Sequence, residues 1–520
     1  MNENSRISPD IASAAKILIQ YKREKRELEA RLLKEGEVWK NVYSGGESSS
    51  WIFNSIVNKH ADIIDSIPTC VCLPREKRDE RYAEMLSKII PVITQRCNFE
   101  QTYSDNSWEK LKHGTAVYGV FWNNSLEDGM GDVDIRPVPL SDIFWEVGTE
   151  DIQSSKNLFI IKLCDKEELE ATYGDFSYDE HREAELTLRS ALDISGSEDK
   201  CLVVDWYYKR HLSDGSALLH FCKFAGDHVL YSSEGDPACV GGWYHHGQYP
   251  VVFDRLYPMG GACGFGLIAI AGETQRYINR IDDDMLDYAD WASKVRFWAK
   301  RSLGVNEREF LDLSRRIVEV EGDIDEEKLR QIDITPIDNG VIDVRRMKLE
   351  ELKEITGSRD VSQGGYSGSV TAASAISILR EAGAKSSRDG IEETFRSYVK
   401  VIALVIELIR QFYTEKRAFR IVGDLGGREY IDFSGKELSD DDGRRAYFDI
   451  EVNATKKSPS EAAQKNQFAK ELYDSGAFKR ENAAETLMML ELMDFEGVAN
   501  LKANIRSLYG EDILKEEKTE

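Results

Sequence analysis

Apolar side chains recur at helical spacing near the start of the chain. A charged run, YKREKRELEARLLKEG, predicts a solvent-facing helix over residues 8–36 that ends at its glycine. A second helix is predicted over residues 51–67, because its apolar positions share one face and Pro68 ends the pattern. A third helix is expected over residues 78–97. The apolar face of the second helix consists of Ile52, Ile56, Ile63 and Ile67.

Between residues 114 and 258 the pattern changes to short runs rich in β-branched and aromatic side chains. GTAVYGVFWNN and VDIRPVPL flank the turn-forming EDGMGD, which predicts a β-hairpin. Helices followed by an antiparallel sheet predict the α+β class, with helix in the majority. Further strand-like runs lie at 157–163, 200–210, 216–226 and 249–258.

A single apolar stripe follows the glycine-rich GGACGFG and runs along a helix predicted over residues 264–300. At about 1.5 Å per residue, this helix would span roughly 55 Å. Its other face is charged, so the apolar side needs a parallel or antiparallel neighbour. The stripe consists of Leu267, Ile270, Thr274, Ile278, Ile281, Met285 and Tyr288, and continues through Ala292 and Val295.

A small mixed module is expected at residues 301–340, with a helix at NEREFLDLS and strands at RRIVEVEGD and LRQIDITPI. A helix returns from it through MKLEELKEI to Gly357. Another helix is predicted over residues 371–417, where Gly383 and Gly390 favour a kink. Three strands follow, at AFRIVGD, REYIDFS and RAYFDIEVN. The capping box SPSE then opens a helical region that extends to the end of the chain.

The composition is acidic: 520 residues carry 93 acidic and 68 basic side chains, a formal net charge of −25. This length predicts more than one domain. Eight scattered cysteines predict free thiols in a reducing cytoplasm. The apolar run VKVIALVIELI contains Lys400 and Glu407 and is too short to cross a bilayer.

The acidic surplus bears on nucleic acids. Proteins that bind DNA tightly usually have a basic surplus, because Lys and Arg neutralise the phosphates. Repulsion is a defect in such a binder. It is an advantage in a conduit, where a polyanion must slide without sticking.

Two glycine-rich stretches invite a nucleotide-binding interpretation. A P-loop needs lysine and then serine or threonine after its last glycine, whereas Gly368 precedes Ser369 and Val370. GGACGFG follows a turn signal and lacks a strand-helix-strand unit around it. The missing motif argues against nucleotide binding, and the alternative for the first stretch is a solvated linker closed by a helix cap at Ser369 or Thr371.

Metal and catalytic motifs are weak in this sequence. Asp282, Asp283 and Asp284 would point about 100° apart on a helix and cannot converge on one ion. His245-His246 and Cys70-x-Cys72 lack the paired spacing of a zinc site. The metalloprotease, hydrolase, deaminase and kinase signatures are not found. We therefore expect no enzymatic activity, no cofactor and no metal.

Over nearly its whole length the chain resembles the portal proteins of tailed bacteriophages, the ring-shaped head-to-tail connectors. GFGLIAIAGETQRYINRIDDDMLDYAD looks like the first stem helix. EITGSRDVSQGGYSGSVTAASAISILREAGAK looks like the second stem helix, the tunnel loop and the kinked wing helix. NQFAKELYDSGAF and the short helices after it look like the crown.

This resemblance implies a division of the chain into named regions. They are an N-terminal arm and wing (1–260), a first stem helix (261–300), a clip (301–340), a second stem helix (341–357), a tunnel loop (358–370), a kinked wing helix with strands (371–455) and a helical crown (456–520).

The resemblance also implies a function. Such proteins form a ring of about twelve subunits at one capsid vertex, the channel for packaging and ejecting double-stranded DNA without sequence specificity. The implied partners are the terminase large subunit, head-tail adaptor proteins, and the major capsid and scaffolding proteins. The implied location is the virion, after assembly in the bacterial cytoplasm, with no membrane contact.

Candidate site residues follow by position. The apolar stripe of residues 267–288 would pack between stem helices of the ring. Four charged clip residues are candidates for docking the motor and adaptor: Arg315, Arg316, Glu319 and Glu321. Exposed charges of this kind are more often merely solvated. The tunnel-loop candidates are Asp360, Gln363, Gly364, Gly365, Tyr366, Ser367 and Gly368.

Two functions from other classes stay open. A nucleotide-dependent enzyme would use one of the glycine-rich loops, so nucleotide binding without ring formation would favour it. An acidic helical scaffold or adaptor would explain the charge, but it leaves the apolar stripe without a partner.

Overall fold

A computed structural model describes most of the chain. The described ranges are 9–43, 50–211, 217–293, 297–299, 329–331, 337–357, 385–422, 428–438, 444–456 and 483–491, with single positions at 308, 467, 470, 471, 473, 474, 476, 501 and 505. The chain divides into a large unit, residues 1–453, and a small unit, residues 454–520. In the small unit, helix α14 (Ala483–Glu491) buries Leu487 and Leu490.

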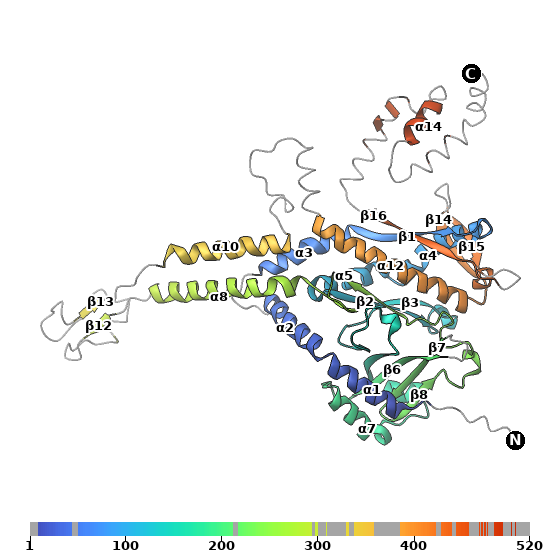
Figure 1. Cartoon of the computed structure of the whole chain (residues 1–520), viewed down its shortest axis with the longest axis horizontal. Helices are drawn as coiled ribbons and strands as arrows, with labels where there is room; N and C mark the ends of the chain where they lie inside the picture. The colour runs from blue at the N-terminus through green and yellow to red at the C-terminus, as the bar shows by residue number, and fades with distance from the viewer. Residues whose placement is uncertain are drawn as a thin grey trace. The chain divides into compact units, whose positions relative to one another are not determined.

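Groups of helices and groups of strands follow one another along the large unit (Figure 1). The helices are α1 (Ile11–Glu24), α2 (Arg26–Tyr43), α3 (Trp51–Ile64), α4 (Glu80–Arg96), α5 (Phe99–His113), α6 (Lys166–Thr172), α7 (Tyr178–Ala191), α8 (Leu267–Ser293), α10 (Asn339–Thr356) and α12 (Lys385–Phe412). The strands are β1 (Ser66–Pro74), β2 (Thr115–Asn123), β3 (Asp132–Pro137), β4 (Ile143–Trp145), β5 (Asn157–Asp165), β6 (Lys200–His211), β7 (Ala217–Ala225), β8 (His228–Ser232), β9 (Val251–Arg255), β10 (Tyr257–Pro258), β11 (Gly264–Phe265), β12 (Phe297–Ala299), β13 (Leu329–Gln331), β14 (Arg417–Val422), β15 (Arg428–Phe433) and β16 (Phe448–Lys456).

Two antiparallel sheets form the middle of the large unit. The predicted hairpin is confirmed: β2 pairs with β3, with Val120 opposite Ile135, and β9 adds on the other side of β2. The second sheet has the order β4-β5-β6-β7-β8, and its three longest strands were predicted from the sequence. This mixture of helices and antiparallel sheets confirms the predicted α+β class.

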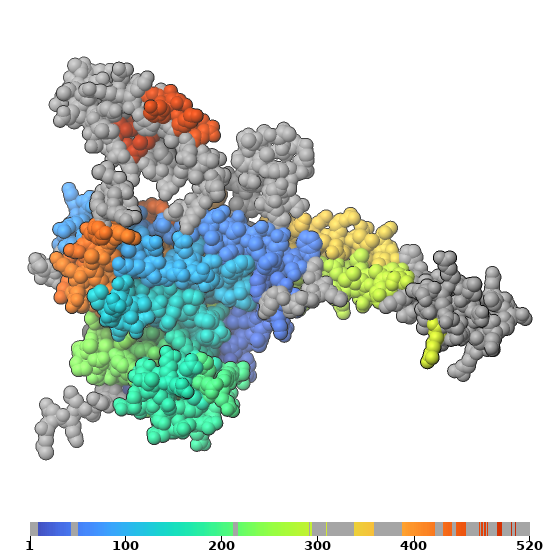
Figure 2. Space-filling view, turned by 180° about the vertical axis from the view of Figure 1, so that it is seen from behind, coloured from blue at the N-terminus to red at the C-terminus, as the bar shows by residue number. Residues whose placement is uncertain are grey.

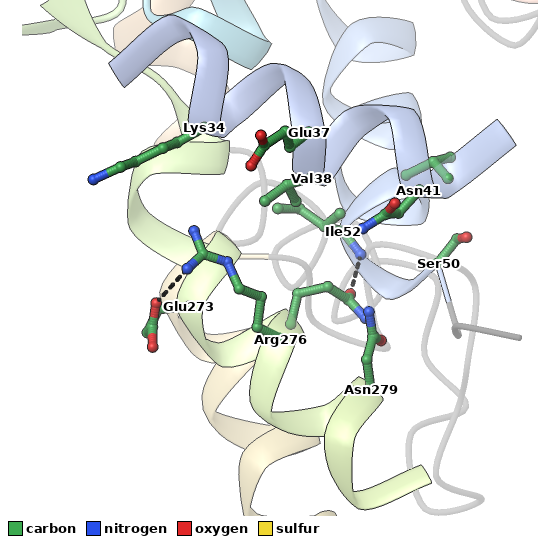
Figure 3. Close-up of a pocket in the computed structure, with 11 residues that line it drawn as sticks. Lys34, Glu37, Val38, Asn41, Ser50, Ile52, Glu273, Arg276 and Asn279 are labelled. Carbon is green, nitrogen blue, oxygen red and sulfur yellow. Dashed lines mark hydrogen bonds and ion pairs between the residues drawn. The ribbon is translucent and has the colours of Figure 1, made fainter. Parts of the chain in front are cut away.

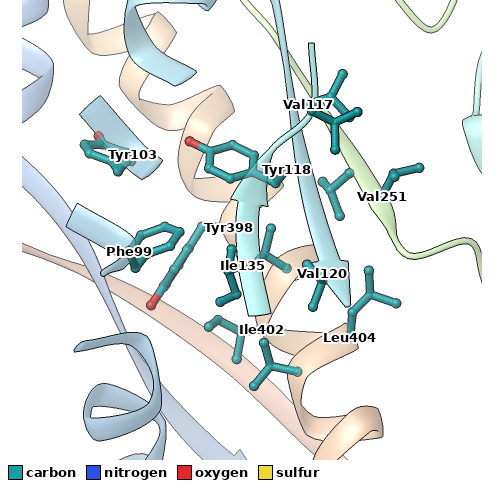
Figure 4. Close-up of a cluster of buried hydrophobic side chains, with 14 of the residues drawn as sticks. Phe99, Tyr103, Val117, Tyr118, Val120, Ile135, Val251, Tyr398, Ile402 and Leu404 are labelled. Atoms are coloured by element: carbon teal, nitrogen blue, oxygen red, sulfur yellow. The ribbon is translucent and has the colours of Figure 1, made fainter. Parts of the chain in front are cut away.

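The main core lies where α12 crosses the three-stranded sheet (Figures 1 and 4). Tyr398 and Ile402 of α12 and Phe99 of α5 gather beside Val120 and Ile135 of the hairpin, and all five side chains are buried. Burying such side chains is the main favourable contribution to folding, at about 1.5–3 kcal/mol each. The core thus holds the C-terminal half of α12 in place.

The first predicted helix is wrong in its boundaries. Two helices, α1 and α2, replace it and join at Lys25, whose buried ammonium donates to the carbonyl of Ile143 at 2.8 Å and also to that of Leu140. Burial lowers the pKa of Lys25 to about 8. Gly36 does not end α2, because Val38 beyond it packs into the main core.

Three other helix ends differ from prediction. The second helix stops at Ile64, and Pro68 lies in β1, where buried and exposed side chains alternate. The long helix α8 ends at Ser293, and residues 297–299 form a strand that pairs with β13. Helix α12 ends at Phe412, because the chain turns there into the β14–β15 hairpin.

Helix α5 was not predicted. Its buried face is largely polar and includes Thr102, Asn106, Ser107 and Lys110. An apolar period of three to four residues is therefore missing from its sequence, although the helix is central to the fold.

The run GGACGFG has a structural role. A Cβ at Gly264 would lie 2.4 Å from the Tyr257 carbonyl oxygen, and one at Gly266 would lie 2.4 Å from that of Lys112. The backbone of Gly114 lies at the same crossing, and Gly264 N–H donates to Thr115 Oγ1 at 2.8 Å. These glycines allow two chain segments to cross closely.

Candidate functional site

The most distinctive feature of the large unit is the antiparallel pair formed by α8 and α10, which we call the α8–α10 hairpin. The two helices lie side by side in both overall views (Figures 1 and 2). Asp338 caps the start of helix α10, and its side chain accepts from Gly340 N–H. It ends where predicted, at Gly357, which adopts the left-handed conformation (φ 68°) typical of a helix C-terminus.

Polar contacts join the two helices. Arg345 of α10 forms a two-pronged ion pair with Asp282 of α8, and Arg345 Nη2 lies 3.2 Å from Asp282 Oδ2. This hydrogen-bonded pair raises the pKa of the Arg345 guanidinium. Nearer the body, Thr274 Oγ1 contacts Glu351 Oε1 at 3.5 Å. The ion pair gives Asp282 a structural role.

Burial falls steeply along the hairpin. Ile278 of α8 and Leu352 of α10 both belong to the main core and are buried. Between Ile281 and Ser293, and from Asn339 to Glu351, no described side chain is fully buried. We call these two stretches the outer half of the hairpin.

The residues of the predicted stripe lie on the more buried side of α8. Leu267, Thr274 and Ile278 are buried within the subunit itself. The other four, Ile270, Ile281, Met285 and Tyr288, are half-buried. A role for the stripe between subunits stays a prediction, but part of its partner surface lies in the same chain.

Sequence reasoning missed the apolar residues that face solvent on the outer half. On α10, Val344 is 48% and Met347 67% exposed, and on α8, Leu286 is 53% exposed. Val341 also lies exposed, so α10 carries valine, valine and methionine at spacings of three. This spacing of three could have indicated an apolar face on α10. The charged residues between the three positions obscured the pattern.

A pocket of about 490 Å³ lies at the base of the hairpin, between α2, the start of α3, and α8 (Figure 3). The buried Gln275 of α8 accepts from Ile52 N–H at 3.0 Å, and its amide nitrogen donates to Asn279 Oδ1 at 2.7 Å. Gln275 thus caps the first turn of α3, where Ser50 makes no side-chain cap. The hairpin is locked to the body at this point.

The discounted metal candidates lie on separate elements. Cys70 and Cys72 lie on β1 as buried free thiols, and burial raises the pKa of Cys70 to about 12. His246 accepts from Gln248 N–H at 3.0 Å. Among the described residues, no group of three suitable side chains could hold a metal ion.

Two sets of predicted residues lie outside the described residues. They are the clip candidates Arg315, Arg316, Glu319 and Glu321, and the tunnel-loop candidates Asp360, Gln363, Gly364, Gly365, Tyr366, Ser367 and Gly368.

The comparison with protein families is decisive. The family model described as "Phage P22-like portal protein" matches residues 54–520, which is most of the chain. This chain belongs to the phage P22-like portal protein family. The match begins within α3, so it covers the main sheets, the α8–α10 hairpin and α12, while α1 and α2 precede it. A search of curated proteins found no match.

Membership in the portal family confirms the resemblance drawn from the sequence. Within the part of the chain that the structure describes, no helix is long and apolar enough to cross a membrane.

Proposed function

We propose that copies of this portal protein form a ring, of about twelve subunits, at one capsid vertex. Double-stranded DNA would pass through it during packaging and ejection. The proposed partners are the terminase large subunit, head-tail adaptors, and the major capsid and scaffolding proteins. ATP hydrolysis would belong to the motor, and we propose no enzymatic role for this chain.

The single observation that carries the ring is the exposed apolar surface on the outer half of the hairpin. In a closed ring, one surface of a subunit meets a different surface of the next. We place Val344 and Met347 of α10 in contact with the α8 of the neighbouring subunit, near Leu286. Charge supports this pairing, because Arg346 is exposed on α10 and Asp287 on α8.

The charge of the chain suits a channel. Twelve copies at −25 each would carry roughly −300 before counterions are considered. Such a ring would repel DNA on average, which favours sliding over adhesion. We assign the clip residues named above to docking of the motor and adaptor, and residues 358–370 to the channel wall.

The test of the ring contact is the paired substitution Val344→Asp with Met347→Asp. Both side chains face solvent in the isolated subunit, so its thermal stability should hardly change. A charge buried without a partner between subunits would cost several kcal/mol at each contact. We therefore expect mass photometry to show mainly single subunits.

Val240→Asp is the matched control, because Val240 is 80% exposed and lies outside the hairpin, on the segment between β8 and β9. That variant should form rings like the original protein. Rings in undiminished proportion for the Val344 and Met347 variant would contradict the proposed contact.

A further inference from the structure

Both ends of the stretch between α10 and α12 are attached to the same helix, α3. At the end of α10, the Thr356 hydroxyl lies 3.2 Å from that of Ser55. At the start of α12, Ser387 Oγ donates to Asp62 Oδ2 at 2.8 Å. Ser55 and Asp62 are seven residues apart on α3, so the two attachment points are separated by roughly 10 Å along that helix.

A second attachment holds α12 one turn further on. Lys110 of α5 is fully buried, and its ammonium donates to Asp254 Oδ1 of β9 at 2.7 Å. The same ammonium donates to the Gly390 carbonyl at 2.9 Å and to Thr394 Oγ1 at 2.5 Å. Asp254 in turn accepts from the hydroxyl of Ser397 at 3.2 Å. One buried ion pair thus binds three positions of α12.

These contacts differ in kind from those that hold the rest of α12. From Tyr398 to Ile409 the helix is held by apolar packing. Apolar packing is non-directional, whereas hydrogen bonds to a buried charge require particular distances and angles. A buried ion pair adds little net stability compared with apolar residues of similar volume, but it can make one arrangement specific.

We propose that Ser55, Asp62, Lys110 and Asp254 are positioning residues. They set where α10 ends and where α12 begins relative to α3 and α5. This inference rests on the proposed function, in which the stretch between α10 and α12 lines the channel. The four residues would then fix the two ends of that stretch. Apolar packing in the core could hold α12 without these four residues. It would not fix the rotation of α12 about its own axis or its shift along that axis.

The test is amide hydrogen exchange in the double variant Lys110→Met with Asp254→Asn. This pair of substitutions removes both charges while keeping the side-chain volumes similar, so the thermal midpoint should hold within a few degrees. We expect exchange at residues 387–397 to become at least about tenfold faster, with residues 401–409 unchanged. Virus particles carrying the variant should contain less DNA.

The control is Lys162→Met with Asp205→Asn, which removes an ion pair 3.1 Å apart in the five-stranded sheet, where Asp205 is buried, Lys162 is partly exposed, and Asp205 also pairs with Lys223 at 3.5 Å. It should leave exchange in α12 unchanged. Unchanged exchange at 387–397 in the test variant would overturn the proposal. Equal acceleration through residue 409 would overturn it as well, whereas full DNA content despite faster exchange at 387–397 would contradict only the link between these residues and the channel.

A third variant keeps the proposal testable if the double variant does not fold. Ser387→Ala removes one hydrogen bond to Asp62 and should accelerate exchange at residues 387–390 alone. No local acceleration would count against the proposal. Exchange is read on the subunit whether or not rings form, so this test and the ring test fail independently.

Discussion

The core beneath α12 and the outer half of the α8–α10 hairpin are built from similar sequence and have opposite environments. In both, apolar residues recur along a helix at spacings of three or four. Ile402 of α12 is buried among side chains of β2, β3 and α5, whereas Met347 of α10 is 67% exposed. The pattern in a sequence shows that an apolar face exists, but not what covers it.

This difference separates the residues that fold the subunit from those that we expect to join subunits. A side chain in the core is removed from water by its own chain, and this burial stabilises the fold. A side chain on the outer half contributes only when a second surface covers it. Substitutions in the two regions should therefore affect different measurements.

The largest effect is expected from Ile402→Ala. This truncation leaves a cavity in the main core, so the free energy of unfolding should fall by about 2–5 kcal/mol. Met347→Ala, on the exposed face of α10, should change it by less than about 0.5 kcal/mol. Urea unfolding of the dilute subunit measures both.

Similar losses for both variants would break the comparison. They would mean that the outer half of the hairpin is as essential to the folded subunit as the core. If Met347→Ala lowers the free energy of unfolding only at concentrations where rings form, the comparison becomes sharper. A neighbouring subunit would then be what buries Met347.

Several elements with an apolar buried face were predicted from the sequence, although β1 and α7 were not. The β2–β3 hairpin and the end of α10 at Gly357 followed from strand periodicity and from a helix-ending glycine. Helix α5 escaped prediction because Lys110, Thr102 and Asn106 take the place of apolar residues on its buried face. Only the folded chain shows that Asp254 lies opposite this lysine, 144 residues away.

The candidate site was predicted in part. The stripe from Leu267 to Tyr288 lies on the more buried side of α8, and its predicted role between subunits stays a prediction. The packing of α10 against α8 is a tertiary contact, and the spacing of apolar residues in the sequence does not predict it. The exposed face of Val344 and Met347 was hidden by the charged residues between them, so only accessibility revealed it.

An effect of intermediate size is expected when the pH is lowered, through His246, a half-buried side chain of the large unit. Burial lowers the pKa of His246 to about 4, below its usual 6.5. The unfolded chain then takes up a proton at a higher pH than the folded chain, so His246 stabilises the fold above pH 6.5. That stability is lost progressively as the pH falls from 6.5 to about 4, and it amounts to about 3 kcal/mol at most.

The measurement is the free energy of unfolding of the original protein minus that of His246→Gln, between pH 7 and pH 4. The difference isolates His246 from the other groups that titrate in this range. It should fall by about 2–3 kcal/mol. A flat difference would show that His246 is hydrated, and that this part of the body is as open as the outer half of the hairpin.

The smallest effect is expected from the ion pair between Asp282 and Arg345, on the outer half of the hairpin. Both side chains are partly exposed, so water screens their attraction. A double-mutant cycle with alanine at each position should give a coupling of about 0.5–1 kcal/mol, which falls in 1 M salt. The exposed pair of Arg276 and Glu273, 3.1 Å apart on α8, should give almost none. A coupling of several kcal/mol that resists salt would mean that the outer half of the hairpin excludes water as the core does, and the contrast between the two regions would fail.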